Sequence, residues 1–291
     1  MSSLREVKDR IASVRSTLKI TSAMKLVASS KLRKAQRAIE AFRPYEMTLA
    51  RILSSIPGGI PATASTRAET AEEGEAVSPT VVLAFSSNTS MCGGFNANVI
   101  RLAMQTVSEA AGPVEVWSFG RKMTDALRKA GILAARDYSQ LVAHPSSEAM
   151  ADISRELREL YDSGAAGSVI LVYNHFVSAG RQVPVAERFL PFEGGAGQAS
   201  DEGGQTGEKD YILEPSKAEL AAALVPQVLD FKLYAALLDS AAAEHAARMV
   251  AMQAATDNAQ DLLAELTLEY NKGRQQKITS EILDIVGGAS E

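Results

Sequence analysis

The polar and apolar positions of the first part of the chain repeat with the period of a helix. Steps of three and four residues from Leu4 to Phe42 land on twelve positions, and ten of them are apolar. A stripe of this kind is typical of a coiled coil. Thr21 and Lys25 are the two polar positions that interrupt it. The pattern predicts a helix over residues 3–56 that cannot bury its apolar stripe alone.

A second helical pattern occupies the end of the chain, from Ser216 to Val286. Ser216 is followed three residues later by Glu219, which is the capping-box arrangement of a helix start. No proline follows Pro226, so an unbroken helix to Val286 would be about 90 Å long, which is more than a compact domain can cover. Twelve alanines lie in the segment 235–264. Their small side chains let a partner backbone approach closely, and they predict a thin, smooth rod.

Between these helices the pattern changes to short apolar runs that alternate with helical stretches. The runs predict strands over residues 81–85, 114–119, 168–173 and 182–190. The intervening patterns predict helices over residues 96–110, 122–130 and 147–163. Alternating strands and helices indicate a small, mostly parallel α/β domain.

The simplest way to bury both long stripes is to pair the terminal helices antiparallel, with the α/β domain inserted between them. The predicted segments are a coiled-coil helix (1–56), a linker (57–79), the α/β domain (80–213, with a polar loop over 193–209) and a second coiled-coil helix (214–291). The register of the helix pair is not fixed by any feature of the sequence.

The net charge of −5 is unevenly distributed along the chain. Residues 1–43 carry eleven Lys and Arg against three Asp and Glu, a net of +8, so the remainder sums to −13. A basic arm is compatible with nucleic acid, with an acidic protein surface, or with a solvated helix face. Few aromatic residues are interleaved with these cations, and the rest of the chain is acidic, which disfavours nucleic acid.

The candidate chemistry in the sequence is weak. The loop Ser90–Asn96 follows a predicted strand and precedes a helix, where a dinucleotide site would place its glycines, but neither G-x-G-x-x-G nor a Walker pattern is present. A tight structural turn is therefore favoured over a nucleotide site. The three histidines lack zinc-ligand spacing, and the single Cys92 allows no internal disulfide, which is typical of a reducing compartment. The sequence predicts no cofactor and no metal.

The long helices offer charged and amide groups at specific points. Met24 and Lys25 lie within the N-terminal stripe, and Arg248, Arg274 and Gln275 interrupt the C-terminal rod. A guanidinium can hold a carboxylate with two parallel hydrogen bonds, so these groups could make specific contacts with a surrounding partner. The alternative is that they are exposed helix charges of little energetic effect.

Several motifs, in this order along the chain, resemble the gamma chain of the F-type ATP synthase. The resemblance runs from end to end, and its most specific parts are near the C-terminus. The motifs are Lys19–Ala28, Cys92–Asn96, Tyr173–Phe176, Glu244–Met252, Ala255–Ala259, Ile278–Ile282 and Ile285–Ala289.

The resemblance implies a coiled coil with an inserted Rossmann-like α/β domain that binds no nucleotide. It implies a non-catalytic subunit, the central rotor shaft, which couples proton-driven rotation of the membrane ring to ATP synthesis in the catalytic beta chains. The implied partners are the alpha and beta chains of the catalytic head, the epsilon chain and the c-ring, with no nucleic acid. The residues that match the family's beta-contact or coupling positions are Met24, Lys25, Arg248, Arg274, Gln275, Thr279 and Glu281.

The expected location is the cytoplasmic side of a bacterial inner membrane, as a peripheral protein, because no apolar run is long enough to span a membrane and the N-terminus lacks a targeting segment. The sequence departs from the family at Asn88–Met91, where the family has an Arg-Gly pair, and at Gly273, where an alanine is usual. Two alternatives remain open, a nucleic-acid-binding coiled coil and a nucleotide-cofactor enzyme that uses the α/β domain.

Overall fold

The computed structural model describes residues 4–54, 78–110, 112–192 and 216–288. The chain divides into two compact units, each of which takes part of both long helices. The coil unit comprises Met1–Ser30 and Arg248–Glu291, and the sheet unit comprises Lys31–Ala247. The predicted division into four consecutive segments stays a prediction. The two units do not test it, because each unit combines parts of both long helices.

Both long helices form where the periodicity predicts them. Helix α1 is Leu4–Ser54 and helix α6 is Lys217–Gly288, with Pro226 inside its first turns. The backbone N–H of Glu219 donates to the Ser216 hydroxyl oxygen at 3.3 Å, as the capping pattern predicts. The predicted linker 57–79 and polar loop 193–209 lie, apart from residues 78 and 79, outside the described residues.

The sheet unit contains a five-stranded sheet in the order β3-β2-β1-β4-β5. Its central strand β1 is parallel to β2 and to β4, β2 is parallel to β3, and β4 and β5 form an antiparallel hairpin. The mostly parallel sheet is therefore confirmed. The strands are β1 Thr80–Phe85, β2 Val114–Phe119, β3 Arg136–Asp137, β4 Ser168–Ser178 and β5 Arg181–Leu190.

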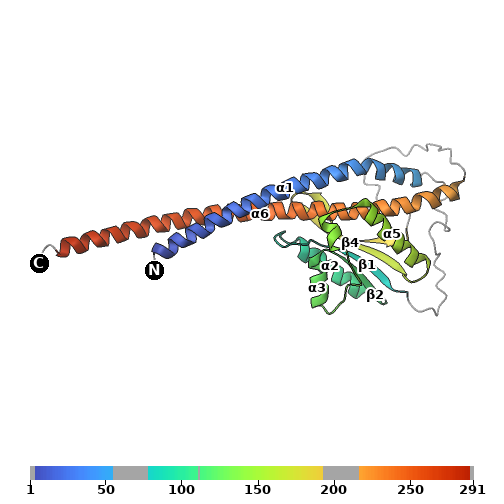
Figure 1. Cartoon of the computed structure of the whole chain (residues 1–291), viewed down its shortest axis with the longest axis horizontal. Helices are drawn as coiled ribbons and strands as arrows, with labels where there is room; N and C mark the ends of the chain where they lie inside the picture. Colours follow the sequence, from blue (N-terminus) through green and yellow to red (C-terminus); the bar gives the residue numbers. More distant parts are fainter. Residues whose placement is uncertain (1–3, 55–77, 111, 193–215, 289–291) are drawn as a thin grey trace. The chain divides into compact units, whose positions relative to one another are not determined.

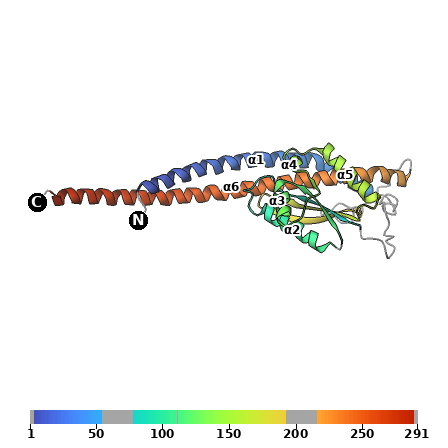
Figure 2. The same ribbon diagram turned by 60° about the horizontal axis from the view of Figure 1, so that its bottom comes forward.

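Helices cover both faces of this sheet (Figure 1 and Figure 2). One face packs against α2 (Phe95–Glu109) and α3 (Arg121–Lys129) through a core that includes Val82 and Val99. The other face packs against α5 (Ser147–Asp162) and the first part of α6. Because both faces are covered, the central strand β1 reads as a continuous apolar run and not as an alternating pattern.

Two short elements of the sheet unit have no counterpart in the sequence prediction. They are β3 and the five-residue helix α4 (Ser139–Ala143). The Ala135 and Tyr138 backbone N–H groups donate to carbonyls of β2, and the Arg136 guanidinium lies over the Trp117 ring at 4.8 Å. Because these contacts are made with residues distant in sequence, no local apolar pattern predicts β3 or α4.

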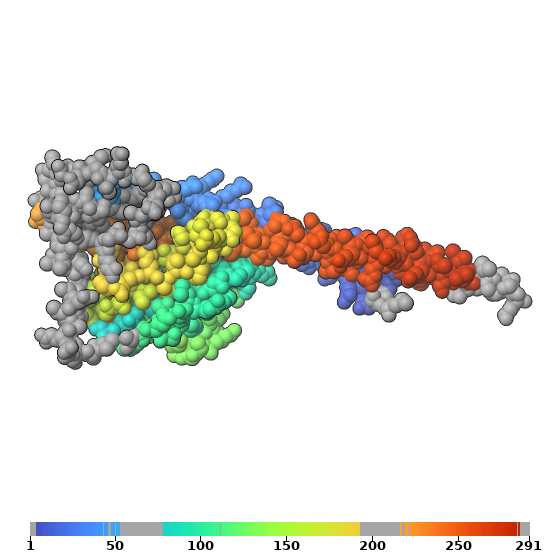
Figure 3. All heavy atoms as spheres, turned by 180° about the vertical axis from the view of Figure 1, so that it is seen from behind, coloured from blue at the N-terminus to red at the C-terminus, as the bar shows by residue number. Residues whose placement is uncertain are grey.

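In the coil unit the two helices run antiparallel. Leu4 lies beside Gly273, and Thr21 lies beside Thr256. A step of 17 residues forward along α1 therefore matches a step of 17 residues backward along α6. Figure 3 shows this part of α6 in red with the start of α1 in blue. A Cβ added at Gly273 would lie 3.1 Å from the Leu4 Cδ2 atom, so an alanine there requires only a small shift of a flexible side chain.

Thr21, which interrupts the apolar stripe in the sequence, is buried in this helix pair and hydrogen-bonded. The Thr256 and Thr21 hydroxyl oxygens lie 3.0 Å apart, and each hydroxyl also has a backbone carbonyl acceptor on its own helix, Met252 at 2.7 Å and Leu18 at 3.1 Å. Each threonine is less than a tenth exposed. A single buried polar pair in an apolar seam favours one register, because any slip leaves both hydroxyls against apolar side chains.

The threonine pair generates a first prediction. Thr256→Val should lower the free energy of unfolding of the chain by about 1 kcal/mol, because the buried Thr21 hydroxyl loses its partner across the pair. The double variant Thr21→Val with Thr256→Val should cost less than the sum of the single variants, because no buried hydroxyl remains. Guanidinium unfolding followed by circular dichroism measures the free energy of unfolding of the wild type, the two single variants and the double variant. Additive single effects would contradict the assignment of a coupled pair.

Candidate functional site on the helix pair

All seven residues predicted to contact a partner belong to the coil unit. Met24 and Lys25 are on α1, and the other five are on α6. The pairing of Thr21 with Thr256 puts Met24 and Lys25 near residue 252 of α6, one to two turns from Arg248. The remaining residues, from Arg274 onwards, lie about 35 Å further along α6. The predicted site therefore consists of two separate groups.

The first group is only partly accessible. Met24, Lys25 and Arg248 are each of intermediate exposure. A half-buried cation keeps its stem against apolar surface and its charged end toward solvent. This group can present a defined, low-mobility contact to a partner.

The second group is fully exposed near the end of α6. Arg274, Gln275, Thr279 and Glu281 lie beyond the residue that faces Leu4, where α1 begins. The Thr279 hydroxyl donates to the Gln275 carbonyl at 2.9 Å. The Lys277 ammonium lies 3.7 Å from the Glu281 carboxylate, and both side chains are well exposed, so this ion pair contributes little by itself.

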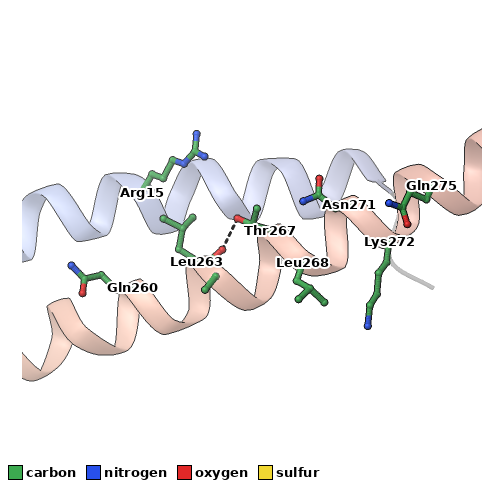
Figure 4. A pocket seen from close by; sticks show the side chains of 9 residues that line it. Arg15, Gln260, Leu263, Thr267, Leu268, Asn271, Lys272 and Gln275 are labelled. Atoms are coloured by element: carbon green, nitrogen blue, oxygen red, sulfur yellow. Dashed lines mark hydrogen bonds between the residues drawn. The ribbon is translucent and has the colours of Figure 1, made fainter.

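A shallow groove of about 680 Å³ runs along the coil unit next to the second group. Figure 4 shows that Arg15 of α1 and Lys272 of α6 point away from each other on its two sides. These two cations therefore do not converge on one ligand, and the groove offers a broad contact face. Its lining is Arg15, Gln260, Leu263, Ala264, Thr267, Leu268, Asn271, Lys272 and Gln275.

The coil unit also exposes large apolar side chains that the sequence reasoning missed. Apolar residues that recur at helical spacing, as Ile278, Ile282 and Ile285 do near the end of α6, are typical of a surface that packs against a partner. The sequence feature that could have indicated them is the number of apolar residues that lie outside the apolar stripe of each helix. They are Ile20, Leu26, Val27, Val250, Leu262, Leu268, Ile278, Ile282, Leu283 and Ile285.

The prediction of a smooth, alanine-covered rod is wrong for much of the segment 235–264. Several of its alanines are buried, and Ala243 packs against Cys92 and Phe95 of the sheet unit. The small side chains therefore allow close approach within the chain itself. The buried alanines are Ala236, Ala241, Ala242, Ala243, Ala246 and Ala259.

The carboxyl ends of β1 and β2 form the place where a nucleotide site would lie in an α/β sheet. There the N-terminal N–H groups of α3 already have acceptors within the chain. The N–H groups of Arg121, Lys122 and Met123 donate to the Asn88 side-chain oxygen, the Ser87 carbonyl and the Ser86 hydroxyl. These are the donors that a phosphate at the start of a helix would need.

Gly120 makes this close packing possible. Its φ is +105°, and a Cβ at this position would collide with the Ser86 carbonyl. The Asn88 side-chain amide also donates to the Ser139 carbonyl at 2.8 Å. The loop Asn88–Met91, which departs from the family pattern, is thus held by hydrogen bonds of the Asn88 side chain. Met91 is 62% exposed and has a φ of 68°.

One titratable group in the sheet unit stands out by its environment. Burial raises the pKa of Asp239 above its ordinary value of 3.8, although the His175 ring and the Phe176 backbone N–H both act to lower it. The His175 Nδ1 atom lies 2.5 Å from one Asp239 oxygen, and the Phe176 N–H donates to the other at 3.1 Å. Asp239 thus joins α6 to the end of β4.

Among the described residues, no group of three or more His, Cys, Asp or Glu side chains gathers in a way that could hold a metal ion. None of the helices in those residues combines the length and the apolarity that crossing a membrane requires.

Comparisons with known proteins place this geometry in context. A family model described as ATP synthase matches residues 3–290. The ATP synthase gamma chain of Bacteroides fragilis is 46% identical over 294 residues, which cover 99% of this chain and 99% of the relative. The gamma chain of Flavobacterium johnsoniae is 40% identical over 99% of this chain and 98% of the relative.

Solved structures show the same fold at lower identity. A chain of the Euglena gracilis mitochondrial ATP synthase, in a structure of its OSCP, F1 and c-ring, aligns with a TM-score of 0.63 and 19% identity. The alignment covers 99% of this chain and 93% of that one. The two proteins share the α/β fold with its long terminal helices.

The environment of Asp239 generates a second prediction. A carboxyl group whose pKa is raised on folding binds more protons in the folded state, so its contribution to stability is present below pH 3.8 and is lost as the pH rises through the folded-state pKa. Asp239→Asn removes this titration. The melting temperature of the variant minus that of the wild type should therefore increase as the pH rises above 3.8 through the folded-state pKa. A difference that stays constant or decreases with pH would contradict the raised pKa.

Proposed function

The chain belongs to the family of ATP synthase gamma chains, and from this premise we propose that it is the central rotor shaft of an F-type ATP synthase. As such it is a non-catalytic subunit that couples rotation of the membrane ring to ATP synthesis in the beta chains. The observation that carries this proposal is the match to gamma chains over 99% of both lengths. The nucleic-acid and nucleotide-enzyme alternatives have no comparable support.

Rotary coupling requires contacts that differ between states. A partner that binds all states of a catalytic site equally shifts none of them. In the proposed function the coil unit stands within the ring of alpha and beta chains and presents a different face to each beta chain at each angle. Its surface suits this role, because charged residues, amides and exposed apolar side chains are distributed unevenly along it.

We assign the contact with the beta chains to the two groups of predicted residues. The half-buried Met24, Lys25 and Arg248 form the group nearer the sheet unit along each helix, and the exposed group near the end of α6 begins with Arg274 and Gln275. The fork of Arg274 can hold a backbone carbonyl or a carboxylate with two hydrogen bonds, and Gln275 can both donate and accept. Thr279 and Glu281 complete the exposed group.

The sheet unit would make a different set of contacts. We propose that it binds the epsilon chain and the c-ring, on the cytoplasmic side of a bacterial inner membrane and peripheral to it. The similar Euglena gracilis chains come from structures of a mitochondrial ATP synthase rotor and of its OSCP, F1 and c-ring, which supports assembly within such a complex. Proton coupling belongs to the membrane ring and is part of the same proposal.

The third prediction concerns Arg274 and Gln275. The double variant Arg274→Ala with Gln275→Ala should co-purify with the alpha and beta chains, because most of the contact surface remains. Its rate of ATP synthesis should fall by about fivefold or more, since losing charge-assisted hydrogen bonds of about 1.5–3 kcal/mol from one rotary state changes rates by such factors. Synthesis and hydrolysis are measured in the reconstituted complex.

The control replaces a neighbouring exposed amide that does not line the groove, Gln276→Ala, and should leave synthesis within about twofold of the wild type. Unchanged rates in the Arg274 and Gln275 variant would refute the assignment of these residues. A wild-type chain that purifies alone, without two ATP-binding chains, would refute the rotor function itself.

A further inference from the structure

Helix α6 is attached to the sheet unit by more than its apolar face. Val225, Leu229, Leu233 and Leu237 are buried in the core over the sheet. Apolar burial holds the helix against the sheet, but it is non-directional and depends mainly on the area removed from water. Three charged side chains of α6, which the sequence reasoning did not single out, add directional contacts in the same stretch.

The first contact joins α6 to α5. The Arg158 guanidinium lies 3.2 Å from the Asp230 carboxylate, and both side chains are about three-quarters buried. Partial burial reduces screening by water, so this pair is stronger than an ion pair on the open surface.

The second contact joins α6 to the edge strand β5. The Lys232 ammonium lies 2.7 Å from the Glu187 carboxylate and donates to the Arg188 carbonyl at 3.3 Å. The Tyr173 hydroxyl donates to the same Glu187 carboxylate at 3.1 Å. Lys232 is thus tied to both strands of the β4–β5 hairpin through one carboxylate.

The third contact is that of Asp239 with the end of β4. One of its oxygens faces the His175 ring and the other accepts the Phe176 backbone N–H. Phe176 in turn packs beside Cys92, Phe95 and Ala243. This contact therefore connects α6 to the β1–α2 loop through a packed cluster.

The three contacts lie on both sides of the buried face. With about 100° between successive residues, Asp230 is about 90° to one side of the apolar face, and Lys232 and Asp239 are about 70° to 90° to the other. A rotation of α6 about its own axis in either direction must stretch the pair on one side and compress it on the other. The arrangement resists twisting, which apolar burial alone opposes only weakly.

We propose that these contacts, made by Asp230, Lys232 and Asp239, form the joint through which torque passes between helix α6 and the α5, β4 and β5 elements of the sheet unit. The inference rests on the proposed rotor function, since torque has meaning only in a rotating shaft. It assigns a positioning role to six side chains, namely these three and their partners Arg158, Glu187 and His175.

The test uses the complete ATP synthase with the triple variant Asp230→Ala, Lys232→Ala and Asp239→Ala. With the catalytic head immobilised and a bead on the membrane-ring end, the angular variance of the bead should increase by about twofold or more, because only non-directional packing remains. ATP hydrolysis without load should remain near the wild-type rate. ATP-driven proton pumping against a gradient should fall relative to hydrolysis.

The matched control is Glu156→Ala, which removes the ion pair between Arg136 and α5 but touches no residue of α6. It should leave the angular variance unchanged. A charge swap gives a second test: Asp230→Arg alone should increase the variance, and adding Arg158→Asp should restore it. If the triple variant does not assemble, the angular variance of the Asp230→Arg variant and of the Asp230→Arg, Arg158→Asp double variant tests the proposal.

A triple variant, or an Asp230→Arg variant, with the stiffness and pumping ratio of the wild type would overturn the proposal. So would a Glu156→Ala control that is as compliant as the triple variant, since the effect would then reflect general loosening of the sheet unit. A wild-type complex that does not rotate would count against the rotor function and not against this joint.

Discussion

A helix of 72 residues cannot bury an apolar face by itself, and the rest of the chain supplies what covers α6. In the coil unit its partner is the start of α1, packed antiparallel. In the sheet unit its partners are one face of the sheet, α5 and the second part of α1, where Phe42 and Tyr45 pack edge-on against Phe231. Helices α2 and α3 cover the opposite face of the sheet.

The two kinds of partner give the helix two kinds of surface. Against the sheet, alanines permit close packing and charged side chains at the margins fix its orientation. Along the coil unit, the seam with α1 buries only one side, and the other side carries exposed apolar, amide and charged groups. The same helix is therefore held firmly within the sheet unit and offers a varied surface to partners within the coil unit. This is the combination that a rotor shaft needs.

Much of the fold could be predicted from the sequence, because its elements depend on local patterns. Apolar runs and helical periods located the four longer strands and the long helices to within a few residues. The strand β3 was missed because its pairing with β2 involves two residues without an apolar run. Thr21 was read as a flaw in the stripe, since its partner Thr256 is 235 residues away and only the folded pair explains it.

The candidate site was predictable only through the resemblance. Nothing in the period or charge of the sequence distinguishes Arg274 from other exposed helix cations, and its role in the site stays a prediction. The joint formed by Asp230, Lys232 and Asp239 could not be predicted from the sequence, because the partners of these residues lie on α5, β5 and β4, far away along the chain. The alanine-rich segment was misread because composition does not reveal which side of a helix is covered.

Direct observation of rotation tests the central claim. Leu133 is 92% exposed and Cys92 is buried, so Leu133→Cys gives a single reactive thiol on the sheet unit. A bead attached there, in a complex immobilised by its catalytic head, should turn in one direction on addition of ATP and stop when ATP is removed. A bead that only fluctuates while the same complex hydrolyses ATP would contradict the account.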